Sequence, residues 1–383
     1  MQRRLFNEDH EAYRSTVREF IEREVTPHYA EWERNRLIAR SALAGAATAG
    51  IYGLEIPEEF GGAGVADYRF RVVVNEEMAR AHATSLNMTL TLQDDLFLPY
   101  VLDLASHAQL ERWLPGLATG QLIGALAMTE PGAGSDLRGI RTTATPTNNG
   151  WVLSGQKTFI SSGSSADLIV VAARTPSDRL SLFMVERDMP GFVRGKKIKK
   201  LGMHAQDTSE LFFDNVVLDP GQLLGREGDG MLQLRSHLAR ERLATTVFAV
   251  TSARAILDAT MSYVEGRQAF GRRVADFQNT RFVMAELATE VEIAEHFADE
   301  QVRAYMHGTF TPTDAAKGKW WATELEKRVV DRCLQFHGGY GYMLEYPVAR
   351  AFLDSRVQTI YGGTTEIMKE IIARDLFPHP AAS

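Results

Sequence analysis

Apolar residues recur at helical spacing in the first part of the chain. With arginine and glutamate between them, the residues in this pattern are Tyr13, Val17, Phe20, Ile21 and Val25. Such spacing predicts an amphipathic helix with one buried face, and Pro27 is expected to end or bend it. We therefore predict a helical domain over residues 1–118.

The pattern changes to short apolar runs between about residues 121 and 225. These runs are bounded by turn residues and include 168–171, 182–185 and 211–213. The segment 148–150, Asn-Asn-Gly, is a strong turn signal directly before Trp151. Short runs with turns between them predict strands, and we assign a β domain to residues 119–226.

From Gly228 onward the apolar spacing is helical again. One long stripe consists of Met284, Leu287, Val291, Ala294, Ala298, Val302 and Tyr305. A helix of that length needs a partner on its apolar face, which predicts a helical bundle. We assign this domain to residues 227–383. The order helical, β, helical predicts an α+β multi-domain protein.

Composition and charge narrow the class of protein. The chain has 383 residues, of which 45% are hydrophobic and 24% charged, as is usual for soluble globular proteins. The net charge of -7 argues against nucleic acid as the main partner, because nucleic-acid-binding surfaces are usually basic. No run of about 18 apolar residues occurs, so we expect no membrane span.

The cysteine count and the first residues bear on location. A single cysteine, Cys333, excludes an intrachain disulfide and fits a reducing compartment. Acidic residues begin at Glu8, and no apolar run of signal-peptide length comes before them. We therefore expect a cytoplasmic protein.

Common nucleotide and metal motifs are missing from the sequence. The glycine-containing segment 132–137 lacks the third glycine of the dinucleotide fingerprint and lies at the edge of the predicted β region. No Gly-Lys-Ser/Thr phosphate loop, no His-Glu-x-x-His and no Gly-x-Ser-x-Gly elbow occurs. We expect no metal site, and a cofactor must be held in a way that these short patterns do not describe.

Five segments, taken together and in order, resemble the acyl-CoA dehydrogenase family. They are 127–136, 155–161, 240–243, 267–271 and 335–367. Segment 203–213 and the Tyr-Gly-Gly-Thr sequence at 361–364 are most similar to the long-chain branch. The resemblance implies an N-terminal helical domain, a middle β-barrel-like domain and a C-terminal four-helix-bundle domain. It also implies FAD held between domains, usually in a homotetramer.

The family's reaction needs an α-proton base, a hydride acceptor at the β carbon, and donors that hold the thioester oxygen as enolate charge develops. By resemblance, flavin N5 is the acceptor. Many members carry the base as the glutamate of a Tyr-Glu-Gly-Thr motif, but Gly362 stands at that position here. The long-chain and isovaleryl branches place the glutamate on a helix of the C-terminal bundle, and Glu241 matches that position.

Two interpretations of Glu241 differ in where the carboxylate lies. The Arg-Glu-Arg run at 240–242 can be a solvated helix face, because charged residues are mostly exposed. The resemblance, with a glycine at 362, favours Glu241 as the base, its pKa raised by desolvation beside the acyl chain. The N–H of Gly362 is implied to hold the thioester oxygen together with a flavin ribityl hydroxyl, although Gly362 also suits a simple turn.

The resemblance implies further contacts within one subunit. Positions that match contacts to the flavin ring are Met128, Thr129, Phe159 and Ser161. Ser135 matches a residue near both flavin and substrate, and Arg242 matches one near the CoA end of the substrate. The plainer interpretations are strand packing and turn chemistry for the first group, and a loop serine for Ser135.

Other positions match contacts to FAD from a neighbouring subunit or at its far end. Those that match a neighbour's contacts are Arg267, Phe270, Gln335 and Gly339. Arg267 would meet the pyrophosphate, for which a guanidinium is well suited, or it is a surface charge. Thr364 and Glu366 match contacts to the phosphate and adenosine end. A carboxylate in a first helical turn, as at Glu366, also has a purely local explanation.

The combined prediction is FAD-dependent α,β-dehydrogenation of a medium to long or branched acyl-CoA to the trans-2-enoyl-CoA, as in fatty acid β-oxidation. An electron-transfer flavoprotein is the implied electron acceptor. Two alternatives stay open: an oxygen-using oxidase or monooxygenase on the same fold, and a dehydrogenase of a carrier-protein-bound acyl thioester. Glu241 argues against a monooxygenase, which needs no α-proton base. A catalytically inactive binding protein is disfavoured, because each flavin-contact position is chemically suitable.

Overall fold

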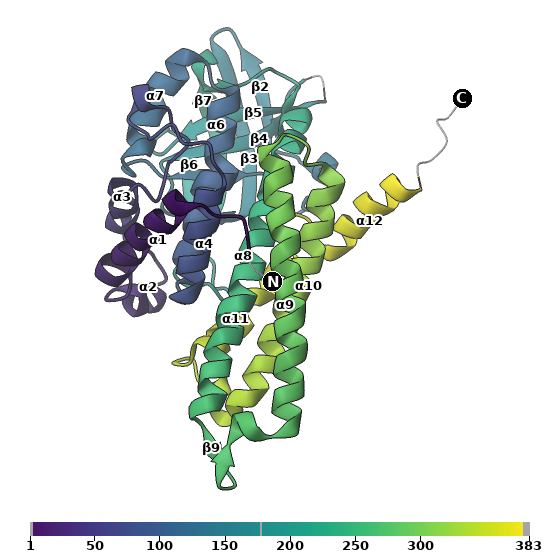
Figure 1. Cartoon of the computed structure of the whole chain (residues 1–383). Coiled ribbons are helices and arrows are strands. Elements are labelled where there is room, and N and C mark those ends of the chain that lie inside the picture. The colour runs from purple at the N-terminus through teal and green to yellow at the C-terminus, as the bar shows by residue number, and fades with distance from the viewer. Residues whose placement is uncertain (1–2, 177, 378–383) are drawn as a thin grey trace.

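The computed structural model describes residues 3–176 and 178–377. Figure 1 shows a β-rich unit at the top of the molecule, N-terminal helices beside it, and long C-terminal helices that extend away from it. The observed order of helices, strands and helices is the one that the apolar pattern predicts.

Helices form the N-terminal part of the chain. They are α1 (Glu8–Phe20), α2 (Tyr29–Asn35), α3 (Arg40–Thr48), α4 (Arg69–Arg80), α5 (Thr84–Thr91), α6 (Leu98–Leu104) and α7 (His107–Ala118). The predicted apolar face is confirmed by the buried side chains of Val17, Phe20, Ile21 and Val25. A π-helical turn, Ile21–Val25, continues α1 and ends before Pro27.

A second π-helical segment, η3 (Leu92–Phe97), joins α5 to α6. It carries Asp94 and Asp95, whose side chains are buried. Arg71 of α4 compensates both charges, with Nη1 at 3.2 Å from Asp94 and Nη2 at 3.3 Å from Asp95. π-helical turns inside α-helices are frequent at functional sites, and this one contacts the longest C-terminal helix, as described below.

Eight strands form the middle sheet among the residues that the structure describes. They are β1 (Gly124–Ala127), β2 (Thr143–Thr147), β3 (Gly150–Ser161), β4 (Leu168–Arg174), β5 (Leu180–Glu186), β6 (Phe192–Lys197), β7 (Thr208–Leu218) and β8 (Leu223–Leu224). Their order is β6-β7-β3-β2-β4-β5-β8, and β1 pairs with β4 in parallel. The predicted apolar runs lie in β4, β5 and β7, and the Asn-Asn-Gly turn joins β2 to β3.

The C-terminal helices are α8 (Gly230–Gly266), α9 (Gln278–Met306), α10 (Pro312–His337), α11 (Pro347–Ser355) and α12 (Thr365–Leu376). A short hairpin of β9 (Gln268–Ala269) and β10 (Arg272–Arg273) joins α8 to α9. The predicted stripe on α9 is confirmed, because its buried residues include Leu287, Val291, Ala294, Ala298 and Val302. Figure 1 shows the hairpin at the far tip of the bundle and α12 pointing away from it.

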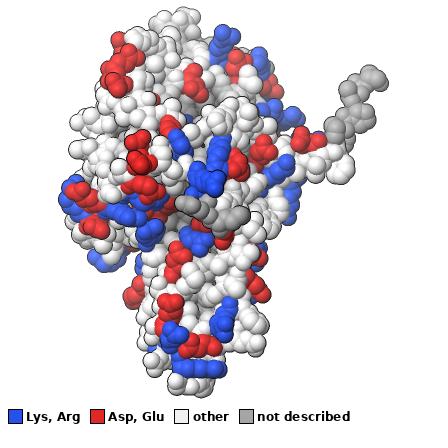
Figure 2. Space-filling model, viewed as in Figure 1, with Lys and Arg blue, Asp and Glu red and all other residues white. Residues whose placement is uncertain are grey.

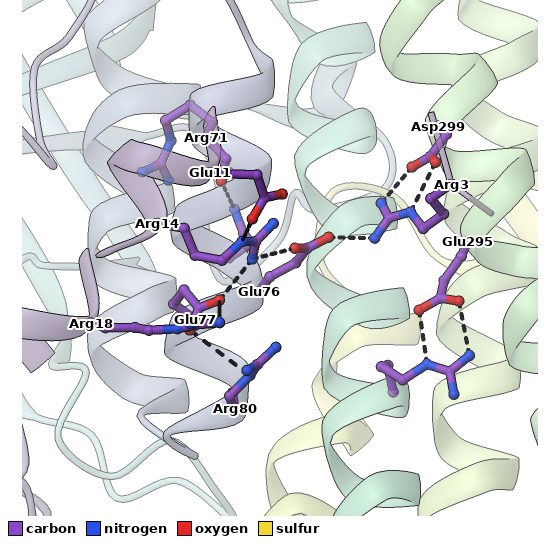
Figure 3. Close-up of polar contacts among 12 residues, drawn as sticks. Arg3, Glu11, Arg14, Arg18, Arg71, Glu76, Glu77, Arg80, Glu295 and Asp299 are labelled. Atoms are coloured by element: carbon purple, nitrogen blue, oxygen red, sulfur yellow. Dashed lines mark hydrogen bonds and ion pairs between the residues drawn. The ribbon is translucent and has the colours of Figure 1, made fainter. Parts of the chain in front are cut away.

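Ion pairs connect the N-terminal helices to the C-terminal bundle. Arg14 of α1 has Nη1 at 2.7 Å from carboxylate oxygens of both Glu76 and Glu77 in α4. Arg3 pairs with Glu76 and also with Asp299 of α9, as Figure 3 shows. These ion pairs and the buried apolar residues between α4 and α8 hold the N-terminal helices against the bundle. The apolar residues contact the side of α8 that faces away from the candidate active site.

Figure 2 shows acidic and basic side chains interspersed over the visible face. Within residues 3–176 and 178–377, no helix combines the length and apolar character needed to cross a membrane. Over the same residues, no group of three histidine, cysteine or acidic side chains is arranged to hold a metal ion.

Candidate active site

Glu241 and Gly362 lie side by side although 120 residues separate them in the sequence. Glu241 lies in the long helix α8, about three turns from its start, and is only 8% exposed. Gly362 lies in the loop directly before α12, with φ of +62°. A Cβ added to Gly362 would stand 3.2 Å from Oε1 of Glu241. The two positions at which a base is expected therefore converge on one point.

The run at 240–242 is not a solvated helix face. The exposed fractions of Arg240, Glu241 and Arg242 are 8%, 8% and 7%. Arg240 pairs with Glu55, with Nη1 at 2.7 Å from Oε2, and reaches Asp95 of η3 at 3.4 Å. Arg240 is therefore neutralised within the N-terminal domain and leaves Glu241 free for another role.

Burial raises the pKa of the Glu241 carboxyl above its ordinary value. The nearby cations of Arg242 and, to a smaller extent, Lys319 oppose this rise by stabilising the carboxylate. A carboxyl group in an apolar setting with a raised pKa, but with cations near it, suits a general base that works near neutral pH.

Two cations hold the glycine loop beside Glu241. Arg242 Nε donates to the carbonyl oxygen of Gly362 at 3.3 Å, and Lys319 Nζ donates to that of Gly363 at 2.7 Å. Gly363 also has a positive φ, +98°, and a Cβ there would come within 2.5 Å of Met368. Successive residues with positive φ require glycine, so the Tyr-Gly-Gly-Thr sequence is explained by the conformation of this loop.

Apolar side chains lie farther along the same face of α8. Phe248 follows Glu241 by seven residues, about two helical turns. It packs with Met88 and Met203, and the partly buried Tyr361 contacts this cluster. Since Tyr361 directly precedes Gly362, the apolar cluster begins next to the carboxylate. Methionine side chains adapt readily to apolar ligands of varied shape.

The predicted flavin-ring residues come together at the ends of β1 and β3. The backbone N–H of Thr158 donates to the carbonyl oxygen of Thr129 at 2.9 Å, which places Met128 and Thr129 beside Phe159. Phe159 has a positive φ of 57° and is 66% exposed, so its ring stands out from the strand. An exposed aromatic ring beside hydroxyl groups fits a planar heterocycle such as flavin. Ser161, half-buried, ends β3.

A buried ion pair holds the backbone of the predicted flavin-ring residues in place. Lys157 is enclosed in the β domain, and its Nζ donates to the carbonyl oxygen of Met128 at 3.0 Å and to Glu130 at 2.8 Å. Glu130 also accepts from the backbone N–H groups of Arg141 and Thr142. This network fixes the end of β1. Ser135 lies in the loop that follows, with an exposed side chain.

Four predicted residues lie elsewhere, at the far tip of the helical bundle. The exposed residues of this tip group are Arg267, Phe270, Gln335 and Gly339. Phe270 is 96% exposed with φ of +50°, and the Arg267 guanidinium lies 5.8 Å from the ring of Tyr340. Figure 1 shows this tip, marked by β9, well away from the β domain. One chain alone does not bring the tip group to Glu241.

Thr364 and Glu366 continue the glycine loop into α12. The hydroxyl of Thr364 caps this helix by accepting from the N–H of Ile367 at 3.4 Å. Glu366 is exposed in the first helical turn. The uncapped N–H groups of a helix start, next to a threonine hydroxyl, are suited to a phosphate group. The local cap accounts for Thr364 as well, so both interpretations hold at once.

Lys319 is the residue of this site that the sequence did not reveal. It lies in α10, its exposed fraction is 0%, and its ammonium group meets the glycine loop. Lysine is ordinarily a surface residue, and Lys317 and Lys327 of the same helix are indeed partly exposed. Nothing in the sequence distinguishes Lys319 from these two lysines.

Comparison with known proteins gives one consistent result. Family models described as the N-terminal, middle and C-terminal domains of acyl-CoA dehydrogenase match residues 7–121, 125–216 and 228–377. The long-chain specific acyl-CoA dehydrogenase of Sus scrofa mitochondria is 42% identical over 380 residues, covering 98% of this chain and 88% of the relative.

Solved structures agree. The acyl-CoA dehydrogenase of Geobacillus kaustophilus superposes with a TM-score of 0.95 at 43% identity, over 98% of this chain and 100% of that one. An acyl-CoA dehydrogenase of Bacillus anthracis complexed with FAD superposes with a TM-score of 0.91 at 28% identity, over 97% of this chain and 67% of that one.

Proposed function

Because the chain belongs to the acyl-CoA dehydrogenase family and is an oxidoreductase acting on CH–CH groups, we propose that it dehydrogenates an acyl-CoA thioester at the α and β carbons with Glu241 as base. The predicted family, three-domain fold and enzyme class are confirmed by these matches. FAD is the cofactor, as the resemblance implied. When bound, FAD accepts the β hydrogen as a hydride.

The observation that carries the assignment of the base is the approach of Glu241 Oε1 to Gly362, at 3.2 Å from where a Cβ would lie. The family motif places a carboxylate at residue 362 in many members, and here a buried carboxylate reaches the same point from α8. The Gly362 N–H accordingly holds the thioester oxygen, which makes the α C–H more acidic. Glu241 then takes the α proton.

The residues of the β domain supply the place for the flavin ring. In this proposal the ring lies against Phe159, and the groups of Thr129 and Ser161 donate or accept hydrogen bonds at its heteroatoms. Ser135 would lie near both the flavin and the substrate. Arg242, which already contacts Gly362, faces the CoA end. The exposed ring of Phe159 and the buried Lys157–Glu130 pair that fixes β1 support this arrangement.

For the substrate we propose a medium to long or branched acyl chain. Support comes from the apolar cluster of Met88, Met203 and Phe248 beside the carboxylate, and from the similarity to the long-chain enzyme of Sus scrofa. A chain that lies along this cluster would exclude water from Glu241. A carrier-protein thioester with the same acyl group would use the same residues, and the experiment below separates the two.

We propose a homotetramer in which the tip group of one subunit completes the FAD site of another. In support, Arg267 and Phe270 are exposed. The bundle tip on which they lie is far from the predicted flavin-ring residues of the same chain. An electron-transfer flavoprotein as the acceptor, fatty acid β-oxidation as the process and a cytoplasmic location stay predictions. A base at Glu241 disfavours the monooxygenase alternative.

The reaction is tested by the visible spectrum of the purified protein before and after anaerobic addition of palmitoyl-CoA. We expect an oxidised flavin spectrum that bleaches rapidly, with formation of the trans-2-enoyl-CoA. Repeating the titration in air distinguishes an oxidase, whose flavin would reoxidise with turnover. A flavin that stays oxidised with CoA esters but bleaches with the same acyl group on a carrier protein would replace our substrate with the carrier-bound one.

A further inference from the structure

Lys319 lies in the candidate active site but has no role in the reaction proposed above. Its side chain is completely enclosed between α8, α10 and the start of α12, and Nζ donates to the carbonyl oxygen of Gly363 at 2.7 Å. A buried ammonium group is costly unless it is paired or has a function. A packing role alone would be served better by methionine or leucine of similar size.

The charged groups around Lys319 come from three elements. Glu241 and Arg242 face it from α8, Glu324 lies on its own helix α10, and Glu366 lies on α12. Burial lowers the pKa of Lys319 to about 8, and Glu241 is the strongest of the neighbours that oppose this. With a pKa of about 8 the ammonium form predominates at neutral pH, and Glu241 and Lys319 each favour the charged form of the other.

The same ammonium group fixes the backbone that carries the proposed oxyanion donor. Gly362 and Gly363 have φ of +62° and +98°, a region in which no regular hydrogen-bond ladder holds the chain. Their carbonyl oxygens are instead bound by Arg242 and Lys319. Both contacts bind the peptide groups that follow Gly362, so they anchor the glycine loop directly after the Gly362 N–H.

We propose that Lys319 is a positioning residue for the dehydrogenation: it anchors the glycine loop that carries the Gly362 N–H and favours the carboxylate form of Glu241. This inference rests on the proposed function, in which Glu241 is the base and Gly362 the donor. Lys319 itself does not touch substrate in this account. It acts through the two groups that do.

The charge effect has a definite sign. The titratable and charged groups that face Glu241 are Arg242 of α8, Lys319 of α10, Tyr100 of α6, and Tyr361 before the glycine loop. Burial raises the pKa of Glu241, and the positive charge of Lys319 lowers it. When that charge is removed, the pKa of Glu241 should therefore rise further. The rate of α-proton abstraction depends on the carboxylate form, and its acid limb must therefore move to higher pH.

The test compares Lys319→Met with Lys319→Gln in the FAD-loaded enzyme. Methionine removes both the charge and the hydrogen bond, whereas glutamine keeps a donor for Gly363 without the charge. The readouts are the limiting rate of anaerobic flavin reduction by saturating palmitoyl-CoA across pH, and the exchange of the substrate α hydrogen with deuterated water. Lys317→Met, a partly exposed lysine of the same helix, is the matched control.

We expect Lys319→Met to lower the limiting rate by about tenfold or more, with little change in KM, and to shift the acid limb upward. Lys319→Gln should retain more of the rate but show the same upward shift, and Lys317→Met should match the unaltered enzyme. An unchanged rate and unchanged acid limb in Lys319→Met would overturn the proposal. If that variant does not fold or bind FAD, an unshifted acid limb in Lys319→Gln overturns it.

The outcome is separable from that of the proposed function. If Glu241→Gln still reduces its flavin at the normal rate, the assignment of the base fails and Lys319 has no base to act on. If Glu241→Gln is inactive while the Lys319 variants behave as the unaltered enzyme does, only the inference about Lys319 fails.

Discussion

Oε1 of Glu241 lies 3.2 Å from the point where a side chain on Gly362 would begin. A carboxylate on α8 thus reaches the space that a carboxylate on the glycine loop would fill. Two side chains cannot share that space, so the glutamate at 241 and the glycine at 362 depend on each other. Neither position can be interpreted without the other, and the first prediction follows from this.

Introducing a second carboxylate should harm the enzyme. In Gly362→Glu the new side chain would meet Glu241 at once, and the φ of +62° is unfavourable for any residue with a Cβ. We expect turnover of long-chain acyl-CoA to fall by about tenfold or more. Steady-state kinetics against chain length measures it, with Gly362→Ala as the control that carries the strain without the charge. A clear gain in long-chain turnover would show that Glu241 and residue 362 do not compete for the same space.

Glu241 should also reduce the stability of the fold at neutral pH. Because burial raises its pKa in the folded state, the folded protein binds this proton more tightly than the unfolded chain does. The stabilising contribution of the protonated form is complete below the unfolded-state pKa and is lost as pH rises through the folded-state pKa. Glu241→Gln should therefore unfold at a higher temperature than the unaltered protein at about pH 8.

Thermal unfolding of both proteins without substrate, at about pH 8 and about pH 5, checks this. The advantage of the variant should shrink at the lower pH, because a larger fraction of the glutamate is protonated there. An equal difference at both pH values would mean that the carboxylate is not desolvated in the free enzyme.

The tip group gives a third prediction. Phe270 is 96% exposed in the single chain, so Phe270→Ser should leave the fold of that chain intact. If a neighbouring subunit's FAD covers it, the variant should purify with less flavin per protein and dissociate more readily. Absorbance and size-exclusion chromatography measure the two effects. Val217→Ser, an exposed apolar residue of β7, is the control, and equal flavin content in both variants would count against a shared site.

Much of the fold was predictable because it depends on local spacing. The stripe on α9 follows the helical period, the strands β4 and β5 are continuous apolar runs, and burial confirms all three. The π-helical segment η3 was not predictable. Its Asp94 and Asp95 look like surface residues in the sequence, but Arg71, Arg240 and the backbone N–H of Gly53, all distant in the sequence, compensate their buried carboxylates.

The site was predictable only in its parts. The resemblance identified Glu241 and Gly362 separately, but their contact across 120 residues comes from the packing of α8 against the loop before α12. Lys319 could not be found in this way, because nothing in its neighbourhood marks a lysine that points inward. Its role depends on a carbonyl group, and backbone acceptors leave no trace in a sequence.

The most direct test of the central claim is the rate of anaerobic flavin reduction in Glu241→Gln on addition of palmitoyl-CoA. Glu300→Gln, an exposed glutamate of α9, is the matched control. We predict that Glu241→Gln retains FAD and binds the substrate but loses nearly all flavin reduction, by about a thousandfold or more, while the control bleaches normally. Reduction at a near-normal rate in Glu241→Gln would show that another group removes the α proton.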